Sequence, residues 1–183
     1  ETLDVGDFNN DGFIDIVAVS TSITNPPVFV FVNTGGTGFT QTTAGSVGGL
    51  QNISDLAVDD FNNDGFLDVA VMDDFINDSV TVLINNGLGA LTSISTTALG
   101  ATTPFTIHSG DLDGDGDVDI AVSNRNNNSI TLLTNNGNGT MVLGQTLITG
   151  GFSQDDFAIG DFNGDGSNDI LTVDQSTNPD QVV

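Results

Sequence analysis

Polar and apolar residues alternate along the chain in short stretches that are typical of β-strands. Leu3 and Val5 stand two residues apart before a polar loop, and the apolar runs IDIVAV and VFVFV follow that loop. A dense apolar run such as IDIVAV is expected to be buried on both faces of a sheet. The turn that begins at Asn33 is rich in Asn and Gly, which suits tight hairpins with positive φ. No segment has a convincing period of 3.6 residues, so the sequence predicts almost no helix.

The same pattern recurs about every 50 residues. Four nine-residue segments align without gaps, and they begin at Asp7, Asp60, Asp111 and Asp161. The first three are each followed by two apolar runs and by a turn that starts with Asn-Thr-Gly or Asn-Asn-Gly. Recurrence of one such unit at a nearly fixed period indicates a repeat architecture. Each repeat is expected to hold four short antiparallel strands, as a β-propeller blade does.

The sequence therefore predicts an all-β chain of about three and a half propeller-type blades in a single repeat array over residues 1–183. The expected repeats span about residues 1–53, 54–104, 105–154 and, incomplete, 155–183. Known propellers close with roughly four to eight blades, so we expect a larger propeller or an assembly. Other copies could instead cover the open blade edges, which are otherwise sites of strand pairing. The chain begins inside a patterned segment without an initiator Met, which favours a processed or excised piece.

Each nine-residue segment has the pattern D-x-[DN]-x-D-G-x-x-D. Positions 1, 3, 5 and 9 carry carboxylate or amide oxygens, and position 7 varies, as expected if only its backbone carbonyl is used. Five oxygen donors without nitrogen or sulfur specify a hard cation, and many flexible protein ligands favour calcium over magnesium. Position 12 is apolar or Thr, which rejects the EF-hand, because that motif needs an acid there and flanking helices. Four copies in register also argue against ordinary solvated turns.

Net charge supports a bound cation. The chain has 25 acidic residues and one basic residue, with a formal net charge of −24. Such a balance excludes nucleic acid as a direct partner and argues against anionic membrane surfaces. No stretch approaches 18 apolar residues, so no membrane insertion is expected. Four calcium ions, one per repeat, would reduce the formal charge to −16, and the third loop, with the most acidic ligands, should bind tightest.

The expected role of calcium is structural, since each ion would fasten the first strand of a blade to the second. If a site has a dissociation constant near ~10 µM, millimolar calcium stabilises the fold by about 2.7 kcal/mol per site. Resting cytosolic calcium would leave such sites empty, so an extracellular or cell-surface location is favoured. The chain has no Cys, which excludes disulfides and Cys-ligated metals.

These loops, with the turns Asn85-Asn86-Gly87-Leu88-Gly89 and Asn135-Asn136-Gly137-Asn138-Gly139, resemble the FG-GAP/VCBS repeat family of calcium-binding propeller blades. The resemblance covers nearly the whole chain, but the Phe-Gly and Gly-Ala-Pro elements of integrin repeats are missing, so it is nearer to bacterial secreted members. It implies a calcium-dependent extracellular binding or structural module. By position, it implies calcium ligands at Asp7, Asn9, Asp11, Phe13 (carbonyl) and Asp15; Asp60, Asn62, Asp64, Phe66 and Asp68; Asp111, Asp113, Asp115, Asp117 and Asp119; and Asp161, Asn163, Asp165, Ser167 and Asp169.

Nothing in the sequence points to catalysis. His108 is the only His, and it lacks the partners of a catalytic His; we expect an ordinary strand residue there and a solvated loop residue at Arg125. The favoured function is a non-enzymatic module for adhesion or recognition of an extracellular protein or glycan. Two alternatives are a structural subunit that self-assembles into a filament or ring, and an accessory domain of a secreted polysaccharide-active enzyme.

Overall fold

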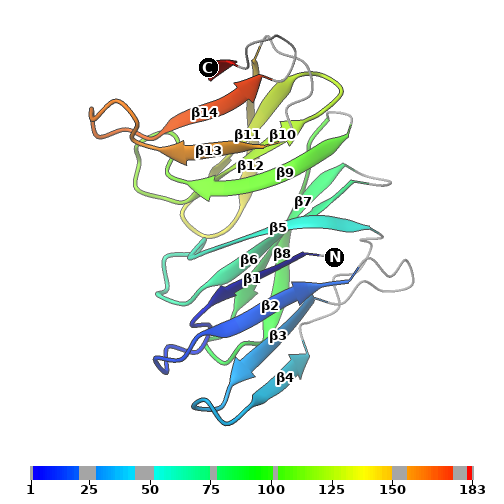
Figure 1. Ribbon diagram of the computed structural model, residues 1–183, viewed down its shortest axis with the longest axis vertical. Coiled ribbons are helices and arrows are strands. Elements are labelled where there is room, and N and C mark those ends of the chain that lie inside the picture. Colours follow the sequence, from blue (N-terminus) through cyan, green and yellow to red (C-terminus); the bar gives the residue numbers. More distant parts are fainter. Residues whose placement is uncertain are drawn as a thin grey trace.

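The structure, a computed structural model, describes residues 2–20, 28–43, 52–74, 78–100, 103–149, 156–174 and 181–182. These residues form fifteen strands in four antiparallel sheets, and they contain no helix. The sheets follow one another along the chain as stacked blades (Figure 1). The prediction of an all-β fold built from four-stranded antiparallel blades is therefore confirmed.

The strands of each blade pair in chain order. The first blade holds β1 (Thr2–Gly6), β2 (Asp15–Val19), β3 (Val28–Asn33) and β4 (Phe39–Thr43). The second blade holds β5 (Ile53–Asp59), β6 (Asp68–Asp73), β7 (Ser79–Asn85) and β8 (Leu91–Ala98). The third blade holds β9 (Pro104–Gly110), β10 (Asp119–Asn124), β11 (Ser129–Asn135) and β12 (Met141–Ile148). In the fourth blade the described strands are β13 (Phe157–Gly160), β14 (Asp169–Asp174) and β15 (Gln181–Val182).

The first strands of successive blades lie beside one another: β1 contacts β5, β5 contacts β9, and β9 contacts β13. The later strands fan outward from this row, as the arrangement of β1 to β4 shows in Figure 1. All four polar nine-residue loops join a first strand to a second strand, and they project from the same side of the molecule (Figure 1, left). The repeat in the sequence thus places its four loops in one row.

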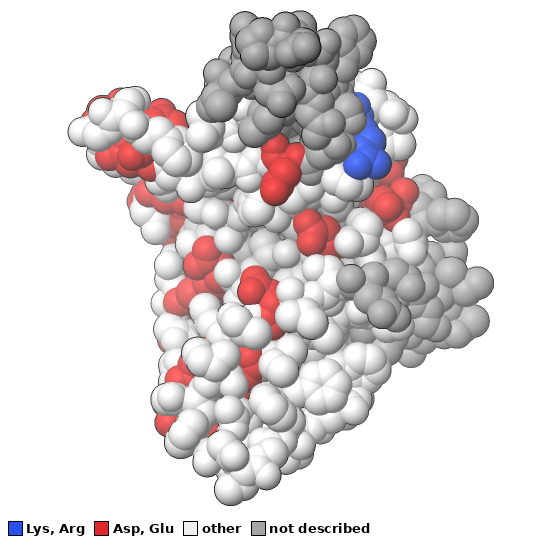
Figure 2. Space-filling view, in the orientation of Figure 1, with Lys and Arg blue, Asp and Glu red and all other residues white. Residues whose placement is uncertain are grey.

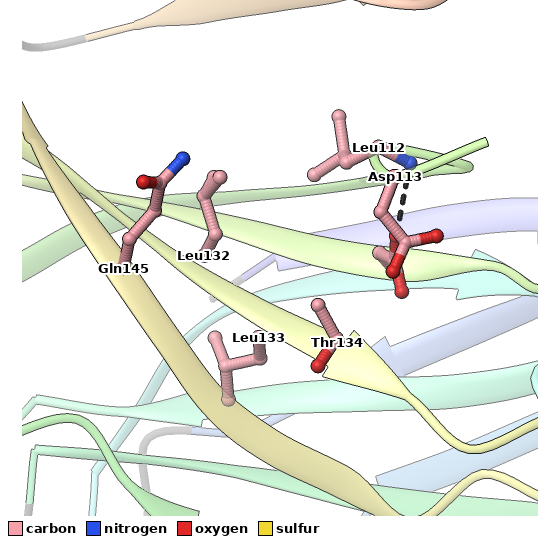
Figure 3. A pocket seen from close by; sticks show the side chains of 7 residues that line it. Leu112, Asp113, Leu132, Leu133, Thr134 and Gln145 are labelled. Atoms are coloured by element: carbon pink, nitrogen blue, oxygen red, sulfur yellow. Dashed lines mark hydrogen bonds between the residues drawn. The ribbon is translucent and has the colours of Figure 1, made fainter. Parts of the chain in front are cut away.

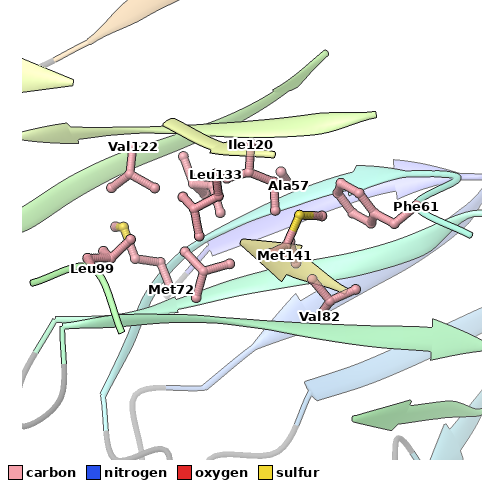
Figure 4. Packing of buried hydrophobic residues seen from close by; sticks show 12 residues of the cluster. Ala57, Phe61, Met72, Val82, Leu99, Ile120, Val122, Leu133 and Met141 are labelled. Atoms are coloured by element: carbon pink, nitrogen blue, oxygen red, sulfur yellow. The ribbon is translucent and has the colours of Figure 1, made fainter. Parts of the chain in front are cut away.

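Apolar side chains fill the spaces between blades. One cluster joins the first and second blades, with Val17 and Val30 on one side and Val71 and Leu83 on the other. A second cluster joins the second and third blades, where Met72 and Val82 face the third blade's Ile120, Val122 and Leu133 (Figure 4). A smaller third cluster joins the third and fourth blades. Burial of these side chains supplies the main stabilising free energy of the stack.

Burial along the second strands depends on the position of the blade. Every residue of β6 and β10 is buried, as expected for strands covered on both faces. In β2 burial alternates, because only the face that carries Val17 and Val19 packs against the second blade. The apolar run of the first repeat therefore differs from the expectation of two buried faces: within the described residues, one face of the first blade is uncovered.

Candidate metal centres

The first aspartate of each loop organises the backbone of that loop. In the first loop, Asp7 accepts hydrogen bonds from the backbone amides of Asp11 (3.1 Å) and Gly12 (2.8 Å). Gly12 has a φ of 89°, which favours glycine because a side chain there would be strained. Asp60 accepts the corresponding bonds in the second loop. The loop therefore curls around its own acidic side chains.

The third loop brings three of its predicted ligands together. Carboxylate oxygens of Asp111, Asp113 and Asp115 lie within 4.8 Å of one another. Three carboxylates at this separation repel one another unless a cation lies among them. An oxygen-only donor set also suits a hard cation such as calcium. The side chains of this loop therefore fit the ion that the sequence implies.

The first two loops differ from the third at position 3. The side-chain amide of Asn9 donates to the carboxylate of Asp11 at 3.0 Å, and that of Asn62 donates to Asp64 at 2.9 Å. In the third loop Asp113 holds this position and has no N–H to donate. In the third loop, repulsion between two carboxylates thus replaces the hydrogen bond that the asparagine makes in the first two loops. A bound cation should therefore stabilise the third loop more than the first two.

In the fourth loop the first aspartate accepts the most backbone hydrogen bonds. The amides of Gly164, Asp165 and Gly166 all donate to Asp161, at 2.6 to 3.1 Å. These bonds, with that of Gly166 first, lower the pKa of Asp161. Asn163 donates to the carboxylate of Asp169 at 3.3 Å. The loop thus favours the charged form of Asp161, which a cation requires.

The ninth aspartate of the first three loops is positioned by the blade. Asp15 is fully buried and accepts from the backbone amides of Phe8 (2.9 Å) and Asn33 (2.7 Å). Asp68 and Asp119 accept the equivalent pairs of bonds in the second and third blades. Two bonds leave part of a carboxylate's acceptor capacity for a cation, since its two oxygens offer about four lone-pair sites. This residue therefore ties the loop to the third strand of its own blade, a role that the sequence pattern did not reveal.

Burial raises the pKa of two ninth-position carboxyls. The pKa of Asp68 rises to about 7, mainly because the group is buried and further because Asp64 and Asp60 are negative, while hydrogen bonds from Asn85 and Phe61 oppose the rise. Burial likewise raises the pKa of Asp119. A cation bound among these groups would lower both pKa values, because it stabilises the ionised form.

In the first three loops the seventh residue turns its side chain away from the loop centre. Phe66 packs over Gly87 in the turn of its own blade, and Phe13 packs near Gly35 in the same way. The carboxylate of Asp117 accepts a 2.7 Å hydrogen bond from Asn63 of the neighbouring loop. Ser167 of the fourth loop is exposed, and its amide donates to Asp165. In the first three loops this geometry leaves the backbone carbonyl as the group that position 7 can offer to an ion.

The first asparagine of the second and third Asn/Gly turns has a role that sequence reasoning missed. The side-chain amide of Asn85 donates to the carbonyl of Phe8 in the preceding blade's loop (2.6 Å) and to that of Leu67 (3.0 Å). Its Oδ1 accepts from the amides of Gly87 and Gly89. Asn135 makes the same bonds one blade later, to Phe61 and Val118. We call Asn85 and Asn135 the clamp asparagines; the recurring N-x-G-x-G pattern was the signal for them.

His108 lies in strand β9 and Arg125 is exposed in a turn, as expected, but both also make contacts that the sequence did not show. His108 joins two blades, since its Nε2 lies 3.1 Å from the carboxylate of Asp156 and its ring meets Phe157 edge-on at 4.7 Å. Arg125 is not only a solvated loop residue, because its guanidinium lies 3.5 Å from the ring centre of Phe105. Figure 2 shows this basic group beside acidic side chains that recur along the face of the molecule.

The comparisons with known proteins agree with the repeated blade architecture. The FG-GAP-like repeat family matches the chain three times, over residues 7–71, 60–122 and 111–172. The chain belongs to the FG-GAP-like repeat family. Each match of this FG-GAP-like chain starts at the first aspartate of one loop and extends into the second strand of the following blade. No sequence among the curated proteins matches the chain.

Two solved structures share the fold of this FG-GAP-like chain. A lectin from Agrocybe aegerita, described for specific recognition of non-reducing terminal N-acetylglucosamine, is 21% identical with a TM-score of 0.65. The alignment covers 97% of this chain and 50% of the lectin chain, so the sequence spans half the length of that relative. The Photorhabdus luminescens Tc holotoxin pore is 18% identical with a TM-score of 0.55, over 94% of this chain and 8% of that one. No helix in the described ranges is long and apolar enough to cross a bilayer.

Proposed function

We propose that the chain is a non-enzymatic, calcium-stabilised recognition module that works outside the cell. The proposal rests on the third loop, where carboxylate oxygens of Asp111, Asp113 and Asp115 lie within 4.8 Å of one another. Calcium would be held by positions 1, 3, 5 and 9 and by the carbonyl of position 7. It would supply positive charge that stabilises the link between the first two strands of each blade.

The expected calcium affinity of the loops supports an extracellular role. Millimolar calcium outside cells fills sites of micromolar affinity that resting cytosolic calcium leaves empty. For the ligand, likeness to the N-acetylglucosamine-binding lectin supports a glycan as the class to test first. Binding to a glycan array in calcium, and its loss in chelator, would support this ligand class.

Thermal unfolding with and without a calcium chelator tests the proposal. At a dissociation constant near 10 µM, removing millimolar calcium lowers the melting temperature by roughly 5–10 °C per site. Calcium added back should restore the transition, while the same concentration of magnesium should restore much less. An unchanged melting temperature in chelator would show that calcium does not hold this fold together.

A self-assembling structural subunit is the second candidate, and the first blade favours it. Leu3 is 65% exposed, whereas Leu56 and Ile107 at the equivalent places of the next blades are 7% and 2% exposed. The uncovered apolar face of the first blade could pack against another copy. Particle mass that rises with protein concentration would favour this candidate over a monomeric recognition module.

A further inference from the structure

A cavity of about 300 Å³ opens on the third blade, beside the third loop. Leu112 and Asp113 lie opposite Leu132 and Gln145 in this cavity, and Thr134 lines it below Asp113 (Figure 3). The equivalent places on the first two blades are filled by the chain itself. The segment that fills the equivalent position on the first two blades therefore indicates what kind of segment the cavity on the third blade can bind.

In the first two blades, the turn of the following blade fills this place. Gly89 of the second blade lies so close to Val30 and Val32 of the first that a Cβ atom at Gly89 would be 3.0 Å from Cγ2 of Val32. The hydroxyl of Thr42 donates to the carbonyl of Gly89 at 2.7 Å. Gly139 of the third blade lies in the same way against Val82, Ile84 and Ile94 of the second. Glycine is needed here for its positive φ and for this close approach.

The cavity on the third blade has the same walls. Val30, Val82 and Leu132 each stand three residues before the first asparagine of the turn in their own blade. Val32, Ile84 and Thr134 stand one residue before that asparagine. Gln145 lies on β12 at the irregular pairing opposite Leu132, and Thr42 lies on β4 opposite Val30. The cavity therefore corresponds in position to the two seats that are already filled.

The residue at the second loop position is buried where the turn of the following blade covers it, and is more exposed where no such turn is described. Phe8 and Phe61 are fully buried, and their carbonyls accept from the clamp asparagines Asn85 and Asn135. Leu112 holds this position in the third loop and is only half-buried, and it lines the cavity. The carbonyl of Leu112 could accept a hydrogen bond from the side-chain amide of a turn asparagine, as the carbonyls of Phe8 and Phe61 do. The apolar wall of the cavity could pack against the glycines of the same turn.

We propose that this cavity is the binding site for an Asn-x-Gly-x-Gly turn of a β-hairpin that lies in register with strand β15. Val173 pairs with Val182, and continuing this antiparallel register places the partner of Asp169 at position 186. In the first three blades the turn asparagine stands directly after the partner of the ninth aspartate, so the equivalent asparagine falls at position 187. A hairpin built in this register would therefore bring its turn to the cavity.

A chain extended in register tests the proposal. Appending a copy of segment Leu132–Ile148 directly after Val183 places its turn asparagine at position 187. We expect the amides of the third loop and of β11 to exchange with solvent at least tenfold more slowly than in the parent chain. The matched control carries the same extension with aspartate in place of the turn asparagine, which keeps the shape but removes the amide donor. In the control the slowing should largely disappear.

A second variant tests the cavity from the other side. Thr134→Lys places a long charged side chain in the cavity and should abolish the slowing in the extended chain. Equal exchange in the parent, extended and control chains would overturn the proposal, as would equal slowing in the extended and control chains. Slowing in the parent chain that grows with protein concentration would also overturn it, because a second copy would then occupy the cavity.

Discussion

Each of the first three loops contains two kinds of acidic residue. The accessible ones are placed to bind an ion, and the one at the ninth position is placed to hold the loop to its blade. Asp111, Asp113 and Asp115 are accessible and lie close together, which suits direct binding of an ion. Asp119 is buried and accepts hydrogen bonds from Leu112 and Asn135, so it joins the loop to the third strand. The ion site and the blade scaffold therefore meet at the ninth residue.

Substitution Asp115→Ala should remove one calcium ion per chain. The loss of one of three converging carboxylates weakens the third site by far more than the change in overall charge alone. Calorimetric titration should give one ion fewer than the parent, and hydrogen exchange should become faster in β9 and β10 only. Asp117→Ala is the control, because it removes the same charge but leaves the carbonyl of position 7. Equal stoichiometry in the Asp115→Ala and parent chains would contradict the assignment.

We expect Asp55, which is not part of a metal loop, to make stability depend on pH. Its half-buried carboxylate accepts from the amide of Ile107 at 3.1 Å, and burial raises its pKa above 3.8. The native state then binds this proton more tightly than the unfolded state, so its stabilising effect is present at low pH and is lost as pH rises through the raised pKa. Asp55→Asn should therefore gain stability relative to the parent between pH 4 and pH 7, in saturating calcium.

Urea unfolding at each pH measures this difference. Asp4→Asn serves as control, since Asp4 is exposed on the neighbouring strand β1. If the free-energy difference between the Asp55→Asn and parent chains stayed constant across this range, burial would not be controlling the Asp55 carboxyl.

At the scale of elements, the strands were predictable and their contacts were not. Period-2 alternation before the loops and dense apolar runs after them gave the order of strands in each blade, because side-chain direction alternates along a strand. The N-x-G-x-G pattern predicted a tight turn through its φ requirement. It could not show that Asn85 reaches Phe8, because that hydrogen bond joins residues 77 apart in sequence and depends on how the blades stack.

The clamp asparagines should carry much of the stability between blades. Asn135 is 5% exposed and makes four side-chain hydrogen bonds, two of them to the carbonyls of Phe61 and Val118. Asn135→Ala leaves these groups unpaired, and we expect a loss of about 2–4 kcal/mol in the free energy of unfolding. Asn136→Ala, at the exposed neighbouring position, should change it by less than about 0.5 kcal/mol. Equal losses in urea unfolding would contradict a specific clamp.

At the scale of the whole molecule, the row of loops concentrates charge on one side. Neighbouring loops touch: Asn10 donates to the carbonyl of Gly65 at 2.8 Å, and Asn168 donates to that of Asp111 at 2.9 Å. The stacking of blades therefore brings carboxylates from different repeats close to one another. The sequence predicted each acidic loop separately, but their proximity comes from the stack.

This proximity predicts an unusual response to salt. With a formal charge of −24 and no bound cation, repulsion among the loops opposes the stack. Raising sodium chloride from 0.1 M to 1 M shortens the Debye length from about 10 Å to about 3 Å, so the melting temperature in chelator should rise clearly. In saturating calcium the same salt increase should have a much smaller effect, because the ions already neutralise the loops. Identical salt responses in chelator and in calcium would mean that the acidic loops do not repel one another across blades, and that the cations do not act by relieving such repulsion.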